Sequence, residues 1–326
     1  MIRPTLRLPT LIGLVEAGAA LTALFSIAAF FGPMHRLVEL LTHFRLQYLA
    51  VSALLALVFA VVRRRGWFVL MLTITLLDLW PVAPWYMPGR PAAAATDTQL
   101  KLMTANVWSG NRDTDRLLGL IRTEAPDLVF LQEVTGRWAA ALDALADSYP
   151  YRYVVPRSDN FGVALLARRP FLRVEAVETP GLHRPSLRAE IDLGGRRVSF
   201  IGTHPMPPLG KDGFDARNRQ LAAIAQLAAG IDEPVILAGD LNTTMWGSHY
   251  RRFVAASDLE DARRGFGIVP TWPVELPPAM IPIDHCLASQ DFAVLDFRAG
   301  AQFGSDHLPI IVSLALREAR PAQGRP

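Results

Sequence analysis

Polar side chains that can bind a metal ion or a phosphate group stand at the ends of short apolar runs in the second part of this sequence. These residues are Asn106, Glu133, His204, Asp240 and His307. In layered α/β proteins, ligand-binding sites gather at strand ends and in the loops that follow them. One such residue can occur by chance, but the whole succession indicates that they form a single site.

The segment 239–242 (GDLN) is the most informative of these places. Gly239 allows a sharp backbone turn after the apolar run VILA. Asp240 can then orient or deprotonate a water molecule, and the amide of Asn242 can hold a phosphoryl oxygen or the nucleophile. Glu133 ends another apolar run, where a carboxylate suits a hard cation. A solvated charge is the commoner explanation for a single carboxylate at a strand end.

Two histidines and two further aspartates extend the set. In SDH, Asp306 can bind a metal or the attacking water, and His307 can donate to a phosphoryl oxygen as negative charge develops. Asp284, in PIDHC, is a suitable acceptor to fix the tautomer and orientation of His307. His204, in THP, is a second candidate proton donor or phosphate clamp. Taken alone, each histidine is more simply explained as a satisfied structural residue.

An α/β domain is needed to position these side chains, and the pattern from residue 99 to residue 317 predicts one. Apolar runs alternate with amphipathic segments, and Gly194-Gly195 predicts a hairpin turn. Helices are predicted at 113–124, 137–148 and 215–229. Strands are predicted at 100–105, 128–131, 162–167, 187–192, 197–202, 235–238, 283–287 and 308–316.

The order of these segments resembles one known superfamily, the endonuclease/exonuclease/phosphatase superfamily, over residues 99–317. The resemblance implies a four-layer α/β sandwich, with two packed mixed β-sheets flanked by helices, and the use of Mg²⁺ or Mn²⁺. The matching segments are NV at Asn106, QEV at Glu133, TH at His204, GDLN at Asp240, IDH at Asp284 and SDH at Asp306.

The same resemblance implies a metal site. Asn106 and Glu133 resemble the metal- and phosphate-binding pair of the superfamily, and Asp306 resembles a metal-associated aspartate. Trp108 stands where some branches carry an acidic residue, so one metal contact of those branches has no counterpart at that position.

The catalytic roles that the resemblance implies fall on five residues. Asp240 resembles the residue that activates the nucleophilic water, with Asn242 as its helper. His307 resembles the phosphate-binding histidine, and Asp284 its orienting partner. His204 occupies the place where pancreatic-type deoxyribonucleases, sphingomyelinases and phosphatases carry a histidine, whereas abasic-site endonucleases place a tyrosine-containing segment there.

The first part of the chain predicts a membrane region. Hydrophobic residues make up 51% of the sequence, and the excess lies in three apolar stretches at 11–31, 46–62 and 67–84. A bilayer core needs roughly 20 helical residues, so each stretch is expected to be a transmembrane helix rather than a buried helix of a soluble domain. Glu16 and Asp78 are expected near the lipid headgroups rather than in an ion path.

Arginines predict the orientation of these helices. Arg3 and Arg7 precede the first stretch, and the cluster 63–65 separates the second from the third. If these charges are cytoplasmic, three spans leave the following domain outside. We therefore expect a multi-pass protein of the cell (inner or plasma) membrane with an extracytoplasmic catalytic domain.

The predicted division of the chain follows from these patterns. Residues 1–87 form the membrane region, 88–98 a Pro/Ala-rich linker, 99–317 the catalytic domain and 318–326 a disordered tail. A single cysteine, Cys286, excludes an internal disulfide and a cysteine-based zinc cluster.

Charge and anchoring bear on the substrate. Residues 97–318 contain 23 Lys and Arg against 27 Asp and Glu, a net charge of −4, so nucleic acid is a possible but not a favoured partner. Trp246 and Trp272 are candidates to contact an acyl or polyprenyl chain, although packing explains them equally well. Lys211 and Arg217 are expected to be solvated rather than to bind phosphate.

Three spans followed by this domain also resemble VanJ-type membrane members of the superfamily. That resemblance implies removal of phosphate from a lipid-linked phosphate or pyrophosphate, such as undecaprenyl pyrophosphate, at the outer membrane face. An extracytoplasmic nuclease and a phospholipid or sphingomyelin phosphodiesterase remain as alternatives. The lipid bilayer is an expected partner, and no obligate protein partner is inferred.

Overall fold

A computed structural model of the chain describes residues 10–87 and 98–318. The chain separates into two compact units, Met1–Pro84 and Trp85–Pro326. Residues 88–97 of the predicted linker and residues 319–326 of the predicted tail lie outside the described residues.

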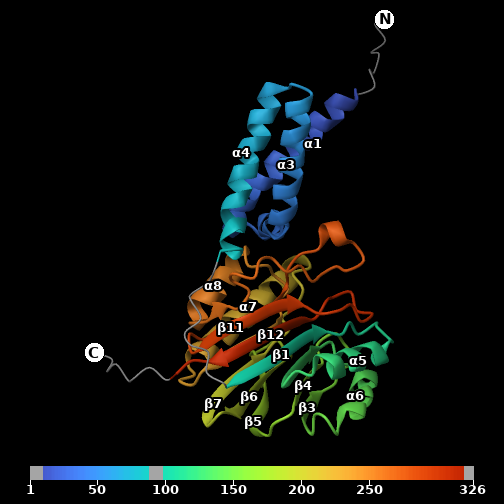
Figure 1. Ribbon diagram of the computed structural model, residues 1–326, viewed down its shortest axis with the longest axis vertical. Coiled ribbons are helices and arrows are strands. Elements are labelled where there is room, and N and C mark those ends of the chain that lie inside the picture. Colours follow the sequence, from blue (N-terminus) through green and yellow to red (C-terminus); the bar gives the residue numbers. More distant parts are fainter. Residues whose placement is uncertain (1–9, 88–97, 319–326) are drawn as a thin grey trace, which may run out of the picture. The chain divides into compact units, whose positions relative to one another are not determined.

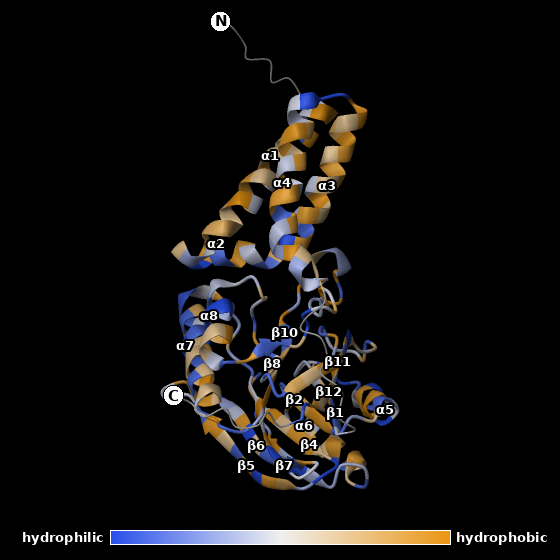
Figure 2. Cartoon of the chain, turned by 60° about the vertical axis from the view of Figure 1, so that its left-hand side comes forward, coloured by the Kyte–Doolittle hydropathy of each residue, from blue (hydrophilic) through white to orange (hydrophobic). Residues whose placement is uncertain are grey.

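The first unit contains three helical segments long and apolar enough to cross a membrane: Leu11–Met34, Arg36–Val61 and Arg65–Trp85. In Figure 2 much of the ribbon of these helices has the colour of hydrophobic residues, as expected for helices that face lipid. The second segment starts earlier than predicted because a short helix and a turn precede its long helix. The third segment ends one residue beyond the first unit, at Trp85. The elements of this region are α1 (Leu11–Ala28), η1 (Ala29–Met34), α2 (Arg36–Leu41), η2 (Thr42–Phe44), α3 (Arg45–Val61), α4 (Arg65–Val82) and η3 (Ala83–Trp85).

A buried ion pair joins helices of this unit. Asp78 of α4 has 0% exposure, and its Oδ1 lies 3.1 Å from Nη1 of Arg45 in α3. Ser26 of α1 donates a hydrogen bond to Asp78 Oδ2 at 2.6 Å. The expectation that Asp78 lies exposed near the headgroups is therefore wrong. A carboxylate within an apolar bundle requires a cation and hydrogen-bond donors to offset its desolvation.

Removal of one partner of this ion pair should lower the stability of the first unit. We expect Arg45→Met to destabilise the first unit by about 3–5 kcal/mol, because Asp78 would remain buried without its cation. The measurement is the thermal unfolding of the full chain in detergent. The double variant Arg45→Met/Asp78→Leu removes both charges and should recover most of the loss. Equal destabilisation in the single and double variants would show that the ion pair is not the cause.

The second unit contains two six-stranded mixed sheets that pack face to face and carry helices outside (Figure 1). The strand order is β11-β12-β1-β2-β4-β3 in the first sheet and β5-β6-β7-β8-β10-β9 in the second. The strands are β1 (Gln99–Asn106), β2 (Leu128–Gln132), β3 (Tyr151–Val155), β4 (Val163–Ala167), β5 (Phe171–Glu178), β6 (Pro185–Leu193), β7 (Arg196–Gly202), β8 (Val235–Asp240), β9 (Glu260–Asp261), β10 (Asp284–Ala288), β11 (Phe292–Ala299) and β12 (Ile310–Leu316).

Alternation along each strand divides the apolar residues between two cores. In β1, Leu100 and Leu102 join the core between the sheets, whereas Met103 and Ala105 join the core beneath the first sheet's helices. The second sheet carries α7, whose Gln220 donates to the hydroxyls of β6 and of the loop after β7. The helical elements are α5 (Thr114–Glu124), α6 (Gly136–Ala141), η4 (Leu142–Leu145), α7 (Gly210–Ala229), α8 (Ser248–Ser257) and η5 (Pro277–Ala279).

This architecture is the predicted four-layer α/β sandwich. The elements β3, β5, β9, β11 and α8 were not among those predicted from the sequence. All four of these strands are the outermost strands of their sheets. An outermost strand pairs on one side only, so its sequence shows a weaker apolar pattern than that of a central strand.

Candidate functional site

Strand topology brings the predicted site residues to one edge of the two sheets. β1 runs parallel to β2, and β7 runs parallel to β8, so the carboxyl ends of each pair lie together. β10 and β12 run antiparallel to β8 and β1, so these two strands begin at the same edge. Residues at the carboxyl ends of β1, β2, β7 and β8 therefore lie at the same edge as residues at the start of β10 and β12.

The first sheet contributes Asn106 and Glu133 at the ends of β1 and β2. Asn106 Nδ2 donates to Glu133 Oε1 at 3.1 Å, and the backbone N–H of Ser109 donates to Glu133 Oε2 at 2.8 Å. Glu133 is buried and has a φ of 63°, in the left-handed region that residues with a Cβ rarely adopt. Such backbone strain at a buried charged residue is typical of functional sites.

The second sheet contributes Asp240 and Asp284 as direct neighbours across the pair β8–β10. Gly239 precedes Asp240 with a φ of 146°, and a Cβ there would lie 2.0 Å from the carbonyl oxygen of Thr203. Glycine is therefore required where β8 passes the end of β7. The same close approach brings His204, the next residue after Thr203, beside Asp240.

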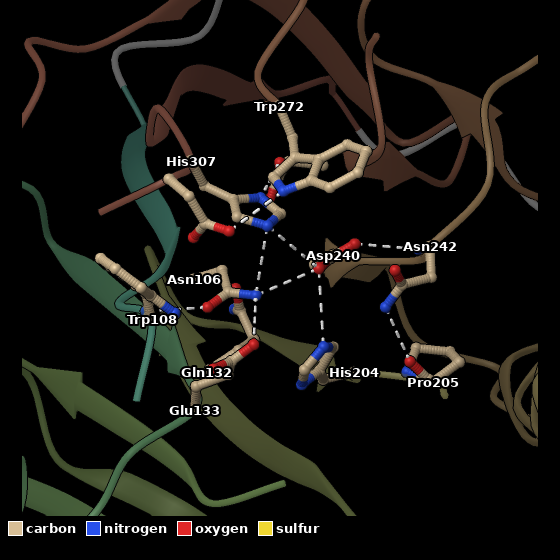
Figure 3. A network of polar contacts seen from close by, with 12 residues as sticks. Asn106, Trp108, Gln132, Glu133, His204, Pro205, Asp240, Asn242, Trp272 and His307 are labelled. Atoms are coloured by element: carbon tan, nitrogen blue, oxygen red, sulfur yellow. Dashed lines mark hydrogen bonds and ion pairs between the residues drawn. The ribbon is translucent and has the colours of Figure 1, made fainter. Parts of the chain in front are cut away.

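Asp240 is the centre of the polar network that Figure 3 shows. Its Oδ1 accepts from the backbone N–H of Asn242 at 2.9 Å, and its Oδ2 accepts from Asn106 Nδ2 at 3.1 Å. Nε2 of His204 lies 3.5 Å from Oδ2, and Nε2 of His307 lies 3.7 Å from it. Residues of both sheets thus converge on a single carboxylate.

The charge states of this centre follow from burial and from the facing groups. Burial alone would raise the pKa of Asp240, but His307 and His204 and the Asn242 N–H lower it to about 2. Burial disfavours the charged form of His307, yet the carboxylates of Asp284 and Asp240 outweigh it and raise its pKa to about 10. At neutral pH the site therefore pairs an aspartate anion with an imidazolium cation.

His307 is held on both sides of its ring and at its backbone. Its Nδ1 lies 2.9 Å from Asp284 Oδ2, the geometry expected for the predicted orienting partner. Its backbone N–H donates to Ser305 Oγ at 3.1 Å, and Ser305 Oγ donates to the carbonyl of Asn106 at 2.8 Å. Ser305 was not predicted to have a role, because a serine beside a stronger motif residue gives no separate signal.

Asp306 is bonded to Trp272 rather than to another charged residue. The indole Nε1–H of Trp272 donates to Asp306 Oδ2 at 3.1 Å, and the indole ring lies 6.3 Å from the His307 ring (Figure 3). Trp272 thus lies within the site and is only partly exposed. Trp246, the other tryptophan proposed to contact substrate, is 4% exposed and offers little surface to a ligand.

Asn242 and Arg217 form the side of the site next to α7. Asn242 has a φ of 51°, and its Nδ2 donates to the carbonyl of Pro205 at 3.0 Å. Arg217 is fully buried and donates to the backbone carbonyl of Asn242 at 3.1 Å. The expectation that Arg217 is a solvated surface residue is wrong, because the helical pattern alone did not show that this position faces the 240–242 loop.

A second buried network lies behind Asp284 and was not predicted from the sequence. Arg263, fully buried, donates to the carbonyl of Asp284 and lies 3.9 Å from Asp261 Oδ2. The neighbouring His285 Nε2 lies 2.8 Å from the carbonyl of Thr243. These bonds fix the backbone of β10 and of the loop after Asp240, and only the tertiary structure brings the participating segments together.

Two groups of side chains in the site have the atoms to bind a metal ion. Ligand atoms of Asp240, Asp284 and His307 lie within 4.8 Å of one another. His307, however, lies between the two carboxylates and is held protonated, so its nitrogens are engaged as donors. We interpret this trio as a carboxylate–imidazolium–carboxylate chain rather than as a metal site.

The other candidate ligands are the carboxylates of Glu133 and Asp306 and the amide of Asn106. The negative charge of Glu133 contributes to raising the pKa of Asp306, after the larger effect of burial. A bound cation relieves such repulsion between nearby carboxylates. Carboxylate and amide oxygens are the ligands that a hard cation such as Mg²⁺ prefers, so the donor set suits the predicted cofactor.

One family model matches the sequence. The Endonuclease/Exonuclease/phosphatase family model covers residues 103–307 and so includes every residue of the site described above. No curated protein matches the chain.

Solved structures share the fold. The endonuclease/exonuclease/phosphatase from Beutenbergia cavernae is 25% identical, with a TM-score of 0.57, over 67% of this chain and 72% of its own. D. rerio TDP2 complexed with single-strand DNA product is 20% identical, with a TM-score of 0.59, over 67% of this chain and 99% of its own. Sphingomyelinase C from Streptomyces griseocarneus is 20% identical, with a TM-score of 0.50, over 66% of this chain and 99% of its own.

Proposed function

Because this chain belongs to the endonuclease/exonuclease/phosphatase family, whose members hydrolyse phosphoester bonds, we propose that it hydrolyses a lipid-linked phosphate or pyrophosphate at a membrane surface. One observation carries this proposal. The site of a phosphoester hydrolase lies in the same chain as three helices long and apolar enough to cross a membrane. Anchoring raises the effective concentration of lipid-linked substrates at the site.

In the proposed reaction, water attacks the terminal phosphorus, the bond from that phosphorus to the lipid-linked oxygen breaks, and inorganic phosphate and the lipid product leave. The residues of the site supply positions and charges for this step. Asp240, ionised at neutral pH, accepts a hydrogen bond from the attacking water and orients it. His307, held protonated by Asp284 and Asp240, donates to a non-bridging phosphoryl oxygen as negative charge develops there. We assign to His204, whose Nε2 lies 3.5 Å from Asp240 Oδ2, a second hydrogen bond to the phosphoryl group.

A divalent cation completes the proposed site. Glu133 and Asp306 would hold it together with Asn106, and the cation would neutralise charge on the phosphoryl group. We propose Mg²⁺, with Mn²⁺ as the substitute that the same oxygen ligands accept.

The dependence of activity on Mg²⁺ gives a direct test of the proposed cation site. EDTA is expected to abolish phosphate release, and excess Mg²⁺ should restore it. Glu133→Gln keeps the shape of the side chain but removes a charged ligand, so it should raise the Mg²⁺ concentration for half-maximal activity at least tenfold. The measurement is a Mg²⁺ titration of phosphate release by both proteins. An unchanged Mg²⁺ requirement in the variant would place the ion elsewhere.

The lipid-linked class is favoured over polynucleotides by charge as well as by anchoring. Residues 97–318 carry a net charge of −4, and a polynucleotide binds best to a basic surface. The resemblance to VanJ-type membrane proteins supports an undecaprenyl-pyrophosphate-like substrate at the outer face. The arginines at 3, 7 and 63–65 support that orientation.

Two alternatives have specific support. TDP2 of D. rerio has been solved with a single-strand DNA product, which favours an extracytoplasmic nuclease as the second candidate. The likeness to a sphingomyelinase C supports a phospholipid or sphingomyelin phosphodiesterase as the third.

A parallel substrate assay separates these candidates. The full chain, reconstituted in vesicles with Mg²⁺, is offered polyprenyl pyrophosphate, plasmid DNA, single-stranded DNA and sphingomyelin. The proposal expects inorganic phosphate from the polyprenyl substrate at a rate well above the rates of DNA nicking and phosphocholine release. Rapid DNA cleavage without phosphate release from the lipid would contradict it.

A further inference from the structure

Exposed apolar side chains gather on the loops that carry the site residues. Leu209 is 78% exposed, Leu276 is 57% exposed and Trp108 is 41% exposed. A single exposed leucine on a protein surface requires no explanation. These three residues, however, belong to three different loops, and each of the loops is bonded to the site.

Backbone bonds place each of these residues close to a site residue. Trp108 donates its N–H to Asn106 Oδ1 at 3.0 Å. Leu276 lies two residues beyond Val274, whose N–H donates to the carbonyl of Asp306 at 3.0 Å.

Leu209, on the third loop, also lies near a hydrogen bond to a site residue. It lies four residues beyond Pro205, whose carbonyl accepts from Asn242 Nδ2 at 3.0 Å. The three exposed side chains therefore lie on loops that leave the sheets at the site, each within four residues of a hydrogen-bonded position.

A second exposed group lies where the third candidate span ends. That span ends at Trp85, and the carbonyl of Trp85 accepts from the N–H groups of Gly265 and Gly267 at 3.1 and 2.9 Å. Phe266, between these glycines, is 38% exposed, and Tyr86 is 57% exposed. Trp85 is both the last residue of the third candidate span and the first residue of the second unit, so the chain itself joins this loop to a segment that can cross a membrane.

The 263–267 loop and the site lie at the same edge of the sheets. Arg263, the first residue of that loop, donates to the carbonyl of Asp284, the first residue of β10. The loops that carry these exposed apolar residues thus all leave the sheets of the second unit at one edge. We call Trp108, Leu209, Phe266 and Leu276 the apolar rim.

We propose that the apolar rim is a membrane-contact face, which rests on a lipid bilayer surface and opens the site onto the headgroup layer. Leucine, phenylalanine and tryptophan are the side chains that enter the boundary between headgroups and acyl chains. Continuity with the end of the third candidate span identifies the bilayer as the partner. The inference goes beyond the proposed reaction, because lipid contact by the rim does not depend on which phosphoester is hydrolysed.

Single-cysteine labelling tests this face in the full chain. The one native cysteine, Cys286, is fully buried, and burial raises the pKa of its thiol, so a maleimide dye should react with an introduced cysteine instead. The labelled variants are Leu209→Cys and Leu276→Cys, with Leu172→Cys as the matched control. Unsubstituted protein, treated in the same way, reports any reaction of Cys286.

Leu172 is a suitable control because it is 55% exposed and lies at the other end of the second sheet. It follows Phe171, which pairs with Ile191 near the end of β6, whereas the site end of β6 is marked by the pair Leu187–Gly202. The control therefore matches the test positions in residue type and exposure.

Quenching by a headgroup-nitroxide lipid in reconstituted vesicles is the measurement. Dyes at positions 209 and 276 are expected to be quenched at least about twofold more than a dye at 172, because rim residues reach the interfacial layer. Equal or weaker quenching at both rim positions overturns the proposal. This result does not depend on turnover, so failure of the proposed reaction and failure of the membrane contact are distinguishable.

Discussion

Asp240→Asn is expected to lower kcat for phosphate release by roughly 10²–10⁴-fold, the usual range for loss of a group that acts on the proton of a nucleophile. The substitution keeps the size and the hydrogen-bond acceptor of the side chain but removes its charge. The ionised carboxylate is what orients the water and what favours the protonated form of His307. The measurement is steady-state release of inorganic phosphate by the full chain in vesicles.

A control is needed because Asp240 is buried and bonded on several sides. The variant should keep the thermal unfolding midpoint of the second unit within a few degrees. Asp215→Asn is a matched aspartate variant on the exposed surface of α7 and should leave kcat unchanged. A normal kcat in Asp240→Asn would remove this residue from the mechanism.

The second large effect concerns His307 and Asp284 as a pair. His307→Ala is expected to lower kcat by roughly 10²–10³-fold, because a charged donor to the developing phosphoryl charge is lost. Asp284→Asn should also lower kcat, because its Oδ2, 2.9 Å from His307 Nδ1, helps to hold the ring protonated and oriented. If Asp284 acts through His307, the double variant should not show the product of the two fold decreases in kcat.

The double variant distinguishes this interpretation from two independent roles. Once His307 is alanine, the further change Asp284→Asn should lower kcat by less than about threefold, as expected for residues that act as a unit. The comparison requires kcat for the wild type, both single variants and the double variant. Losses that multiply in the double variant would assign Asp284 a role of its own.

The central strands were predictable from the sequence, and the strands at the sheet edges were not. β2 and β8 are apolar runs that end in a polar residue, because both of their faces are covered. β5 instead has exposed and charged positions along its length, as an edge strand with a solvated face allows. Its pattern resembles that of a loop until its pairing with β6 is known.

Individual site residues were predictable from the sequence, but most of the residues that hydrogen-bond to them or to their loops were not. A motif marks Asp240 because the close approach of Thr203 to β8 needs glycine at position 239 and the chemistry needs a carboxylate. Gly239 and Asp240 lie within β8, so the predicted turn at Gly239 is wrong. Arg217 and Arg263 support the same loops from sequence positions far from the atoms that they contact. The same limit applies to Asp78, whose partner Arg45 lies on another helix. Such pairs depend on packing, which periodicity in one segment does not show.

The proposed activity of this site is the hydrolysis of a lipid-linked phosphate. Its most direct measurement is inorganic phosphate released from polyprenyl pyrophosphate by the full chain in vesicles, compared between the wild type and Asp240→Asn. We expect Mg²⁺-dependent release by the wild type, loss of that release with EDTA, and a variant slower by roughly 10²–10⁴-fold. Absence of release by the wild type, or equal release by the variant, would contradict it.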